Sequence, residues 1–164
     1  MLGQMLTLEI FIHMDAVDRS TWQGAADDRP LTALGEQQSA RMAAELTAGG
    51  PVQAIFSSQA LRCRASLAPL SARLGLPIRV LPEFQDSAEK ALTALQQIHE
   101  AVPDGRAVLC SYGDVVPALL TQLSAEWRQP PPERDTRKGA VFTLRYAGTT
   151  GSVTARAPSP EFPV

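Results

Sequence analysis

The chain has 164 residues, of which 45% are hydrophobic and 20% charged, and this predicts one globular domain with a single core. Fifteen basic against seventeen acidic residues give a formal charge of -2. This balance excludes non-specific nucleic-acid binding as the main function, because such binding depends on neutralising phosphates. The two cysteines, Cys63 and Cys110, stand far apart, so neither a zinc site nor a disulfide framework is predicted. No stretch approaches the ~20 apolar residues of a membrane span, and the first residues lack signal-peptide features, so we expect a cytoplasmic protein.

The first half of the chain alternates short strand-like segments with longer helical ones. The predicted elements are, in order, a strand over 6–12, a long polar loop over 15–30, a helix from the cap Thr32 to about Ala48, a strand over 52–56 and a helix over about 60–74. Gly49-Gly50 is expected to end the first helix, and Gly75 the second.

The second half continues the same alternation. The predicted elements are a strand over 78–81, a helix whose apolar face runs from Ala91 to Val102, a strand over 107–110, a helix lined by apolar residues from Val115 to Leu123, and a hairpin of 141–146 and 152–156. The apolar residues of both helices recur at helical spacing. We expect residues 1–157 to form one domain, followed by a Pro-rich tail over 158–164.

Strands that alternate with helices indicate βαβ units, so the predicted fold is α/β, a three-layer αβα sandwich whose central sheet is mainly parallel. Right-handed crossovers place the turns after the strands on one edge, where such sheets bind ligands. His13, Ser58 and Tyr112 follow the first, second and fourth strands, and Arg62 in the first turn of the second helix can reach the same edge. We therefore expect these four residues to share one pocket.

Four segments of the chain are informative because of their order and spacing. They are Asp18-Arg19-Ser20-Thr21-Trp22 with Arg29-Pro30-Leu31-Thr32, Ser57-Ser58 with Leu61-Arg62-Cys63, residues 109–117 around Ser111-Tyr112-Gly113, and Lys138-Gly139-Ala140-Val141-Phe142. Together they resemble the histidine phosphatase superfamily, also called phosphoglycerate mutase-like, over about residues 6–156. The likeness is greatest to its short phosphohistidine-phosphatase type and to the phosphatase domain fused to some Nudix hydrolases.

The resemblance implies a phosphoryl-transfer chemistry. In this family a neutral histidine at the end of the first strand attacks a phosphoryl group, and water hydrolyses the phosphohistidine. Two arginines and a second histidine hold the phosphoryl oxygens, and an acid protonates the leaving group. Carried over by motif, His13 is the nucleophile, Arg62 the second arginine and Asp86 the acid, with Glu83 as its rival. The resemblance implies no cofactor and no metal.

Three positions depart from the family pattern. Ile12 stands where an arginine precedes the nucleophile, Met14 stands where a small residue follows it, and Tyr112 replaces the second histidine. The remaining histidine, His99, falls on the polar side of the third predicted helix, where we expect a surface residue. Each lost phosphoryl-binding donor costs about 10²–10³ in rate, so two lost donors predict a loss on the order of 10⁴–10⁶. Efficient phosphomonoester hydrolysis by the usual route is therefore not expected.

Several side chains are candidates for ligand contact, each with a plainer alternative. Arg62 at a helix N-terminus favours an anion, although an aspartate of the polar loop is an alternative partner. Tyr112 either donates a hydrogen bond to a phosphoryl oxygen or fills the pocket, and His13 is either a nucleophile or a relic. The remaining candidates for ligand contact are Ile12, Met14, Arg19, Trp22, Ser58 and Gly113.

Two functions are consistent with these residues. The first is a degenerate family member, inactive as an ordinary phosphatase, that serves as a binding or regulatory module or has a repurposed pocket, apolar around Ile12 and Met14 and polar around Arg62. The second is a weak phosphomonoester or phosphohistidine phosphatase that uses His13 as nucleophile, with Arg62 and Tyr112 as the remaining clamp. Both predict a small molecule, phosphorylated or not, or a protein partner as the ligand, and neither predicts a nucleic-acid or membrane partner.

Overall fold

A six-stranded sheet in the order β3-β2-β4-β1-β5-β6 runs through the middle of the protein. The computed structural model describes residues 3–85 and 87–158, so Asp86 and residues 159–164 of the predicted tail lie outside the described residues. The strands are β1 Leu6–Ile12, β2 Ala54–Ser57, β3 Ile78–Val80, β4 Gly105–Ser111, β5 Val141–Tyr146 and β6 Gly151–Arg156. The α-helices are α1 Ala33–Ala48, α2 Leu61–Leu74, α3 Ala88–Ala101 and α4 Val115–Glu126, and two 3₁₀ helices are η1 Ala26–Asp28 and η2 Pro82–Gln85.

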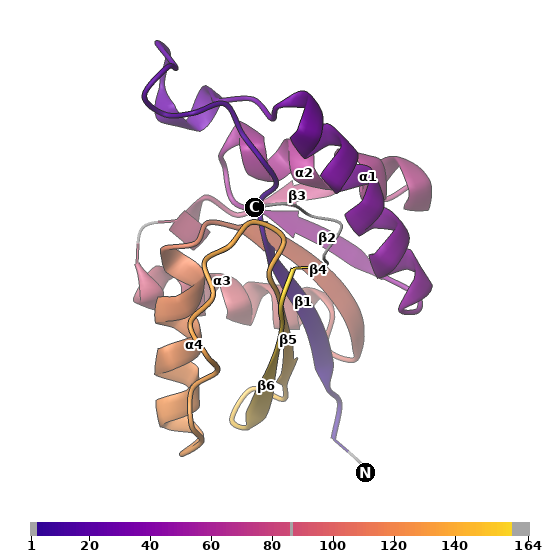
Figure 1. The fold of residues 1–164 in the computed structure, drawn as a ribbon. Coiled ribbons are helices and arrows are strands. Elements are labelled where there is room, and N and C mark those ends of the chain that lie inside the picture. The colour runs from indigo at the N-terminus through magenta and orange to yellow at the C-terminus, as the bar shows by residue number, and fades with distance from the viewer. Residues whose placement is uncertain (1–2, 86, 159–164) are drawn as a thin grey trace.

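The sheet is parallel on one side of β1 and antiparallel on the other. β1 pairs in parallel with β4, and β2 pairs in parallel with both β4 and β3. β5 pairs antiparallel with β1 and with β6. Figure 1 shows α1 and α2 over one face of the sheet and α3 and α4 over the other. The predicted three-layer αβα sandwich with a mainly parallel sheet is confirmed.

The apolar residues form two clusters, one on each face of the sheet, instead of the single core expected from the length of the chain. Ile10 of β1 packs in the cluster that includes Leu95 of α3 and Leu119 of α4. Phe11, the next residue, packs on the opposite face with residues such as Leu67 of α2. Because successive side chains of a strand point to opposite faces, a covered central strand contributes to both clusters.

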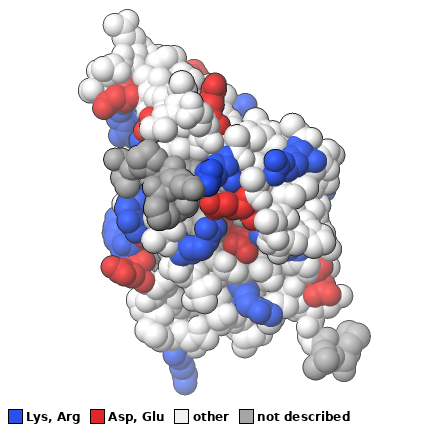
Figure 2. Space-filling view, turned by 45° about the vertical axis from the view of Figure 1, so that its right-hand side comes forward, with Lys and Arg blue, Asp and Glu red and all other residues white. Residues whose placement is uncertain are grey.

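The helix ends confirm the caps expected from the sequence. The Thr32 hydroxyl accepts a hydrogen bond from the Gly35 N–H at 3.0 Å, which satisfies one of the free donors at the start of α1. Gly75 ends α2 in the left-handed region, with φ 67°. No described helix is both long and apolar enough to cross a membrane. On the face shown in Figure 2, basic and acidic side chains are interspersed.

Candidate functional site

The carboxyl ends of β1 and β4 bring His13 and Tyr112 to one edge of the sheet. Ile12 pairs with Ser111 at the ends of the two strands, and the His13 N–H donates to the Ser111 carbonyl at 3.3 Å. α2 begins a few residues after β2, so Arg62 lies in its first turn, with its guanidinium carbon 4.6 Å from the centre of the Tyr112 ring. The structure therefore brings together three of the four residues expected to share a pocket.

His13 has a defined tautomer. Its Nδ1 lies 2.8 Å from the Met14 carbonyl oxygen, which can only accept, so Nδ1 carries the proton and Nε2 carries the lone pair. The pKa of His13 is lowered from 6.5 to about 4, chiefly by burial. The hydrogen bond to Met14 raises this pKa, whereas the positive charges of Arg62, Lys138 and Arg29 lower it. At neutral pH the ring is therefore an uncharged imidazole with an unprotonated Nε2, the state that a nucleophile needs.

Arg62 is buried, with 6% of its surface exposed, and is held by the polar loop. Its Nη1 donates to the Ala26 carbonyl of η1 at 3.1 Å and lies 4.0 Å from the Asp27 carboxylate. The guanidinium also stacks on Tyr112 as a cation–π pair. Its Nε is buried and has no hydrogen-bond partner among the described residues. A buried guanidinium with an unused donor is suited to bind an anion.

Arg29 is a second buried arginine, which the sequence reasoning did not select. It is 8% exposed, its Nη1 donates to the Val17 carbonyl at 2.7 Å, and its buried Nε has no partner in the described part of the chain. Burial lowers its pKa, and the nearby positive charges of Arg62 and Arg19 lower it further. Arg29 and Arg62 are thus two buried guanidinium groups placed close together, an arrangement that attracts a negative ion.

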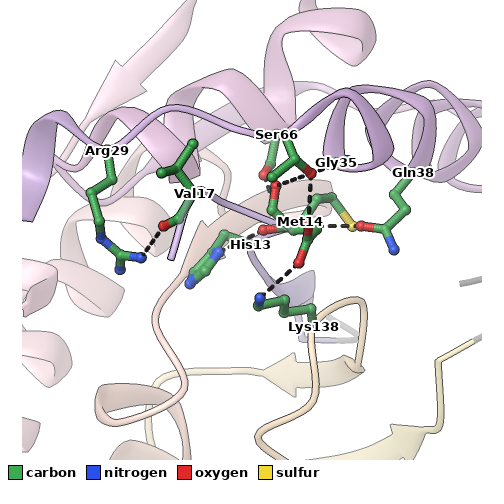
Figure 3. A network of polar contacts seen from close by, with 10 residues as sticks. His13, Met14, Val17, Arg29, Gly35, Gln38, Ser66 and Lys138 are labelled. Atoms are coloured by element: carbon green, nitrogen blue, oxygen red, sulfur yellow. Dashed lines mark hydrogen bonds and ion pairs between the residues drawn. The ribbon is translucent and has the colours of Figure 1, made fainter. Parts of the chain in front are cut away.

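Lys138 adds a third positive charge beside His13. Its Nζ lies 2.9 Å from an oxygen of the Asp15 carboxylate, whose other oxygen accepts from the Thr32 hydroxyl at 2.6 Å. Figure 3 shows the His13 ring between the Arg29 guanidinium and the Lys138 ammonium. Burial raises the pKa of Asp15, but the hydrogen bonds from Thr32 and Lys138 together outweigh this effect and lower the pKa, so the carboxylate stays charged and holds the lysine.

Tyr112 is half-buried and packs against both apolar clusters. Its hydroxyl accepts a hydrogen bond from the Ala60 N–H at the start of α2, at 3.2 Å. Burial is the largest cause that raises the pKa of Tyr112 to about 12, so it stays a neutral phenol. The position of Tyr112 therefore favours filling the pocket over binding a phosphoryl oxygen. The ring packs against the Arg62 guanidinium, and the hydroxyl oxygen accepts from an N–H at the start of α2.

Three predicted ligand contacts lie inside the protein. Ile12 is 2% exposed in the α3–α4 cluster, and Met14 is 0% exposed in the α1–α2 cluster, so neither reaches a ligand-accessible surface. The enclosed apolar pocket expected around them is therefore filled by side chains. Ser58 is also fully buried, because its hydroxyl lies 2.7 Å from that of Ser111 and donates to the Phe84 carbonyl of η2 at 3.1 Å.

The remaining candidates lie around the site or outside it. Arg19 is exposed on the polar loop, and the half-buried Trp22 donates its indole N–H to the Ala25 carbonyl at 2.8 Å. Gly113 packs near Thr136, since a Cβ there would lie 3.3 Å from the Thr136 Cβ. The predicted acid Asp86 lies outside the described residues, as does the side chain of its rival Glu83.

The other histidine and the cysteines do not join the site. His99 is half-buried, not on the surface as expected, because its ring packs edge-on against Tyr146 with centroids 5.1 Å apart. Cys63 and Cys110 are both buried in the α1–α2 cluster, as predicted for small apolar residues. Among the described residues, no group of three or more His, Cys, Asp and Glu side chains is arranged to hold a metal ion.

Known proteins resemble this chain both in part of its sequence and in fold. Residues 15–88 match the model of the histidine phosphatase superfamily, branch 1. The structure of the protein histidine phosphatase SixA complexed with tungstate has a TM-score of 0.71 at 21% identity, covering 90% of this chain and 94% of that chain. The chain thus resembles this superfamily over residues 15–88 and shares the fold of a protein histidine phosphatase over nearly its whole length. YhfR of Bacillus stearothermophilus has the same fold, with a TM-score of 0.76 at 16% identity, covering 96% of this chain and all of that one.

The curated relatives are longer than this chain. An 8-oxo-(d)GTP phosphatase of Mycolicibacterium smegmatis is 26% identical over 141 residues, which cover 84% of this chain and 44% of that protein. A PE-PGRS family protein of Mycobacterium tuberculosis is 41% identical over 71 residues, which cover 43% of this chain and 12% of that protein. The chain thus spans less than half of the length of these relatives.

Proposed function

We propose that the chain binds the phosphoryl group of a phosphorylated small molecule or protein side chain between Arg29, Arg62 and His13, with little hydrolysis. The observation that carries this proposal is the pair of buried guanidinium groups, each with an unpartnered Nε. Leaving a buried donor unsatisfied costs about 1–3 kcal/mol, so each such group calls for an explanation, and an anion bound against the two guanidinium groups is the explanation that we propose. A phosphoryl group offers three oxygens and a negative charge, which matches two arginines placed together.

Slow turnover follows from the two replaced positions. Ile12 is an apolar core residue, and Tyr112 is a neutral phenol whose oxygen accepts from the Ala60 N–H, so neither supplies the charged donor that the family uses there. Arg29 replaces part of the lost charge in the ground state. The charge that develops on the phosphoryl oxygens still meets fewer donors than in a complete clamp, and each missing donor costs about 10²–10³ in rate.

The binding proposal is tested by calorimetric titration of inorganic phosphate into the wild-type chain and two variants. Arg62→Gln removes a proposed ligand contact, whereas Arg64→Gln removes an exposed arginine two residues further along α2 that donates to the Gln59 carbonyl. We expect Arg62→Gln to weaken binding at least tenfold and Arg64→Gln to leave it unchanged. Equal affinity of Arg62→Gln and wild type, or no binding by the wild type, would contradict the proposal.

A second candidate function is slow phosphatase activity, which the tautomer of His13 favours. With the proton on Nδ1, Nε2 can attack phosphorus while the ester P–O bond breaks and the departing oxygen takes a proton from water. Water then attacks the phosphohistidine, which releases inorganic phosphate and restores the imidazole. Hydrolysis of p-nitrophenyl phosphate that His13→Ala abolishes would establish this activity, whereas equal rates for wild type and His13→Ala would exclude it.

Nucleotides are the first organic phosphates to test as ligands. The 8-oxo-(d)GTP phosphatase of M. smegmatis aligns with 84% of this chain, and the polar loop carries Arg19, whose charge acts on Arg29, and Trp22, three residues further along. An aromatic ring and a guanidinium are groups that contact nucleobases by stacking. If nucleotides are ligands, a nucleoside monophosphate should bind more tightly than inorganic phosphate, and Trp22→Ala should remove that difference while leaving phosphate affinity unchanged.

A further inference from the structure

The backbone places Lys138 beside the position of the missing arginine. The Ile12 N–H donates to the Ala140 carbonyl at 3.2 Å, and the Gly139 N–H donates to the Ile12 carbonyl at 3.1 Å. Gly139 has a φ of 82°, a left-handed conformation that favours glycine, and it turns the chain immediately before β5. The residue before this turn is therefore held next to the end of β1, although it is 126 positions away from Ile12 in the sequence (138 against 12).

Asp15 holds the Lys138 side chain beside His13. The Lys138 Nζ lies 2.9 Å from Asp15 Oδ1, and the side chains are 43% and 31% exposed, so the pair is accessible to a ligand in solution. Asp15 itself is held in place, because its carboxylate accepts from the Thr32 hydroxyl, its carbonyl accepts from the Thr32 N–H, and its own N–H donates to Gln38 Oε1. In Figure 3 the ammonium end of the Lys138 side chain points toward the His13 ring.

We infer that Lys138 is a phosphoryl-binding residue that supplies, from the start of β5, the positive charge that Ile12 does not. This inference rests on the proposed function. An ammonium is a compact charge with three N–H donors, and Asp15 uses one of them in the described structure, so a phosphoryl oxygen can be bound by another. Asp15 has two opposing effects, since it positions the lysine and also repels the bound anion.

The test compares two substitutions that a purely structural ion pair would make equivalent. Inorganic phosphate is titrated calorimetrically into wild type, Lys138→Gln and Asp15→Asn, with Arg137→Gln as a matched control one residue away. We expect Lys138→Gln to weaken phosphate binding about tenfold to a hundredfold, and Lys138→Arg to restore most of the loss. Asp15→Asn removes a negative charge but keeps an oxygen that can accept from Thr32 or Lys138, so it should strengthen binding about threefold to tenfold. Arg137→Gln should change the affinity for phosphate by less than about twofold, because that exposed side chain is paired with Asp135.

The outcomes separate this inference from the proposed function. If Arg62→Gln abolishes phosphate binding while Lys138→Gln matches wild type, the phosphoryl site stands and the role of Lys138 is refuted. If Lys138→Gln and Asp15→Asn weaken binding equally and lower the melting temperature together, the pair is structural and the inference fails. If the wild type binds no phosphate, the proposed function fails and this inference fails with it.

Discussion

Mild acid, between pH 6.5 and 4, should destabilise this fold mainly through one side chain, His13. The pKa of His13 is about 4 in the folded chain and returns to about 6.5 on unfolding, so the unfolded chain takes up a proton first as the pH falls. The stability is therefore fully present above pH 6.5 and is lost as the pH falls from 6.5 to 4. The difference between 6.5 and about 4 corresponds to between about 3 and 4 kcal/mol at most, since a change of one in the pKa is worth about 1.4 kcal/mol.

The assay is urea unfolding of wild type and His13→Gln at several pH values. Between pH 7 and pH 4.5, wild type should lose about 2.5 kcal/mol more of its free energy of unfolding than the variant, which has no imidazole to protonate at this position. The chain has only two histidines, so NMR titration with the variant for assignment measures the His13 pKa separately. An identical pH dependence for both proteins, or a midpoint near 6.5 for His13, would refute this account of the buried imidazole.

Three further substitutions have defined consequences. Tyr112→His restores the family's second histidine and should raise the turnover of p-nitrophenyl phosphate about 100-fold, whereas no gain would mean that another missing group limits the rate. Ser111→Ala removes a buried partner of Ser58 and should cost about 1–2 kcal/mol in urea unfolding without changing phosphate affinity; a loss of affinity would place this hydroxyl in the site. Arg106→Gln removes donors to the Leu46 and Gly50 carbonyls at the end of α1 and should cost about 2 kcal/mol, and an unchanged urea midpoint would contradict that capping role.

The sequence predicted the fold and the edge of the sheet that carries the site. Apolar periodicity and glycine stops located every strand and α-helix within a few residues, because packing on both faces of the sheet agrees with the local preferences of these segments. His13, Arg62 and Tyr112 were found because their positions follow from strand ends and a first helical turn. The burial of Ile12 could also have been predicted, since it continues the face of Leu8 and Ile10 along the same strand.

The rest of the site depends on where loops run, which local patterns do not encode. Arg29 comes from the polar loop and reaches the site because the loop is closed by backbone hydrogen bonds such as Val17 N–H to Pro30 carbonyl, at 2.9 Å. Lys138 is placed by a turn after a proline-rich segment. Ser58 stands at the expected strand end, but its hydroxyl is buried by a partner on β4. The sequence therefore revealed that the family's first arginine and second histidine are replaced. It did not reveal that the fold brings Arg29 and Lys138 to the same place.

The most direct test of the phosphoryl site is a crystal structure of the chain grown with tungstate, located by its anomalous scattering. If Arg29, Arg62 and His13 bind a phosphoryl group, tungstate should lie with its oxygens within hydrogen-bonding distance of both guanidinium groups and with an oxygen or the tungsten facing His13 Nε2. Tungstate found only elsewhere on the surface, or an empty site at a saturating concentration, would contradict it.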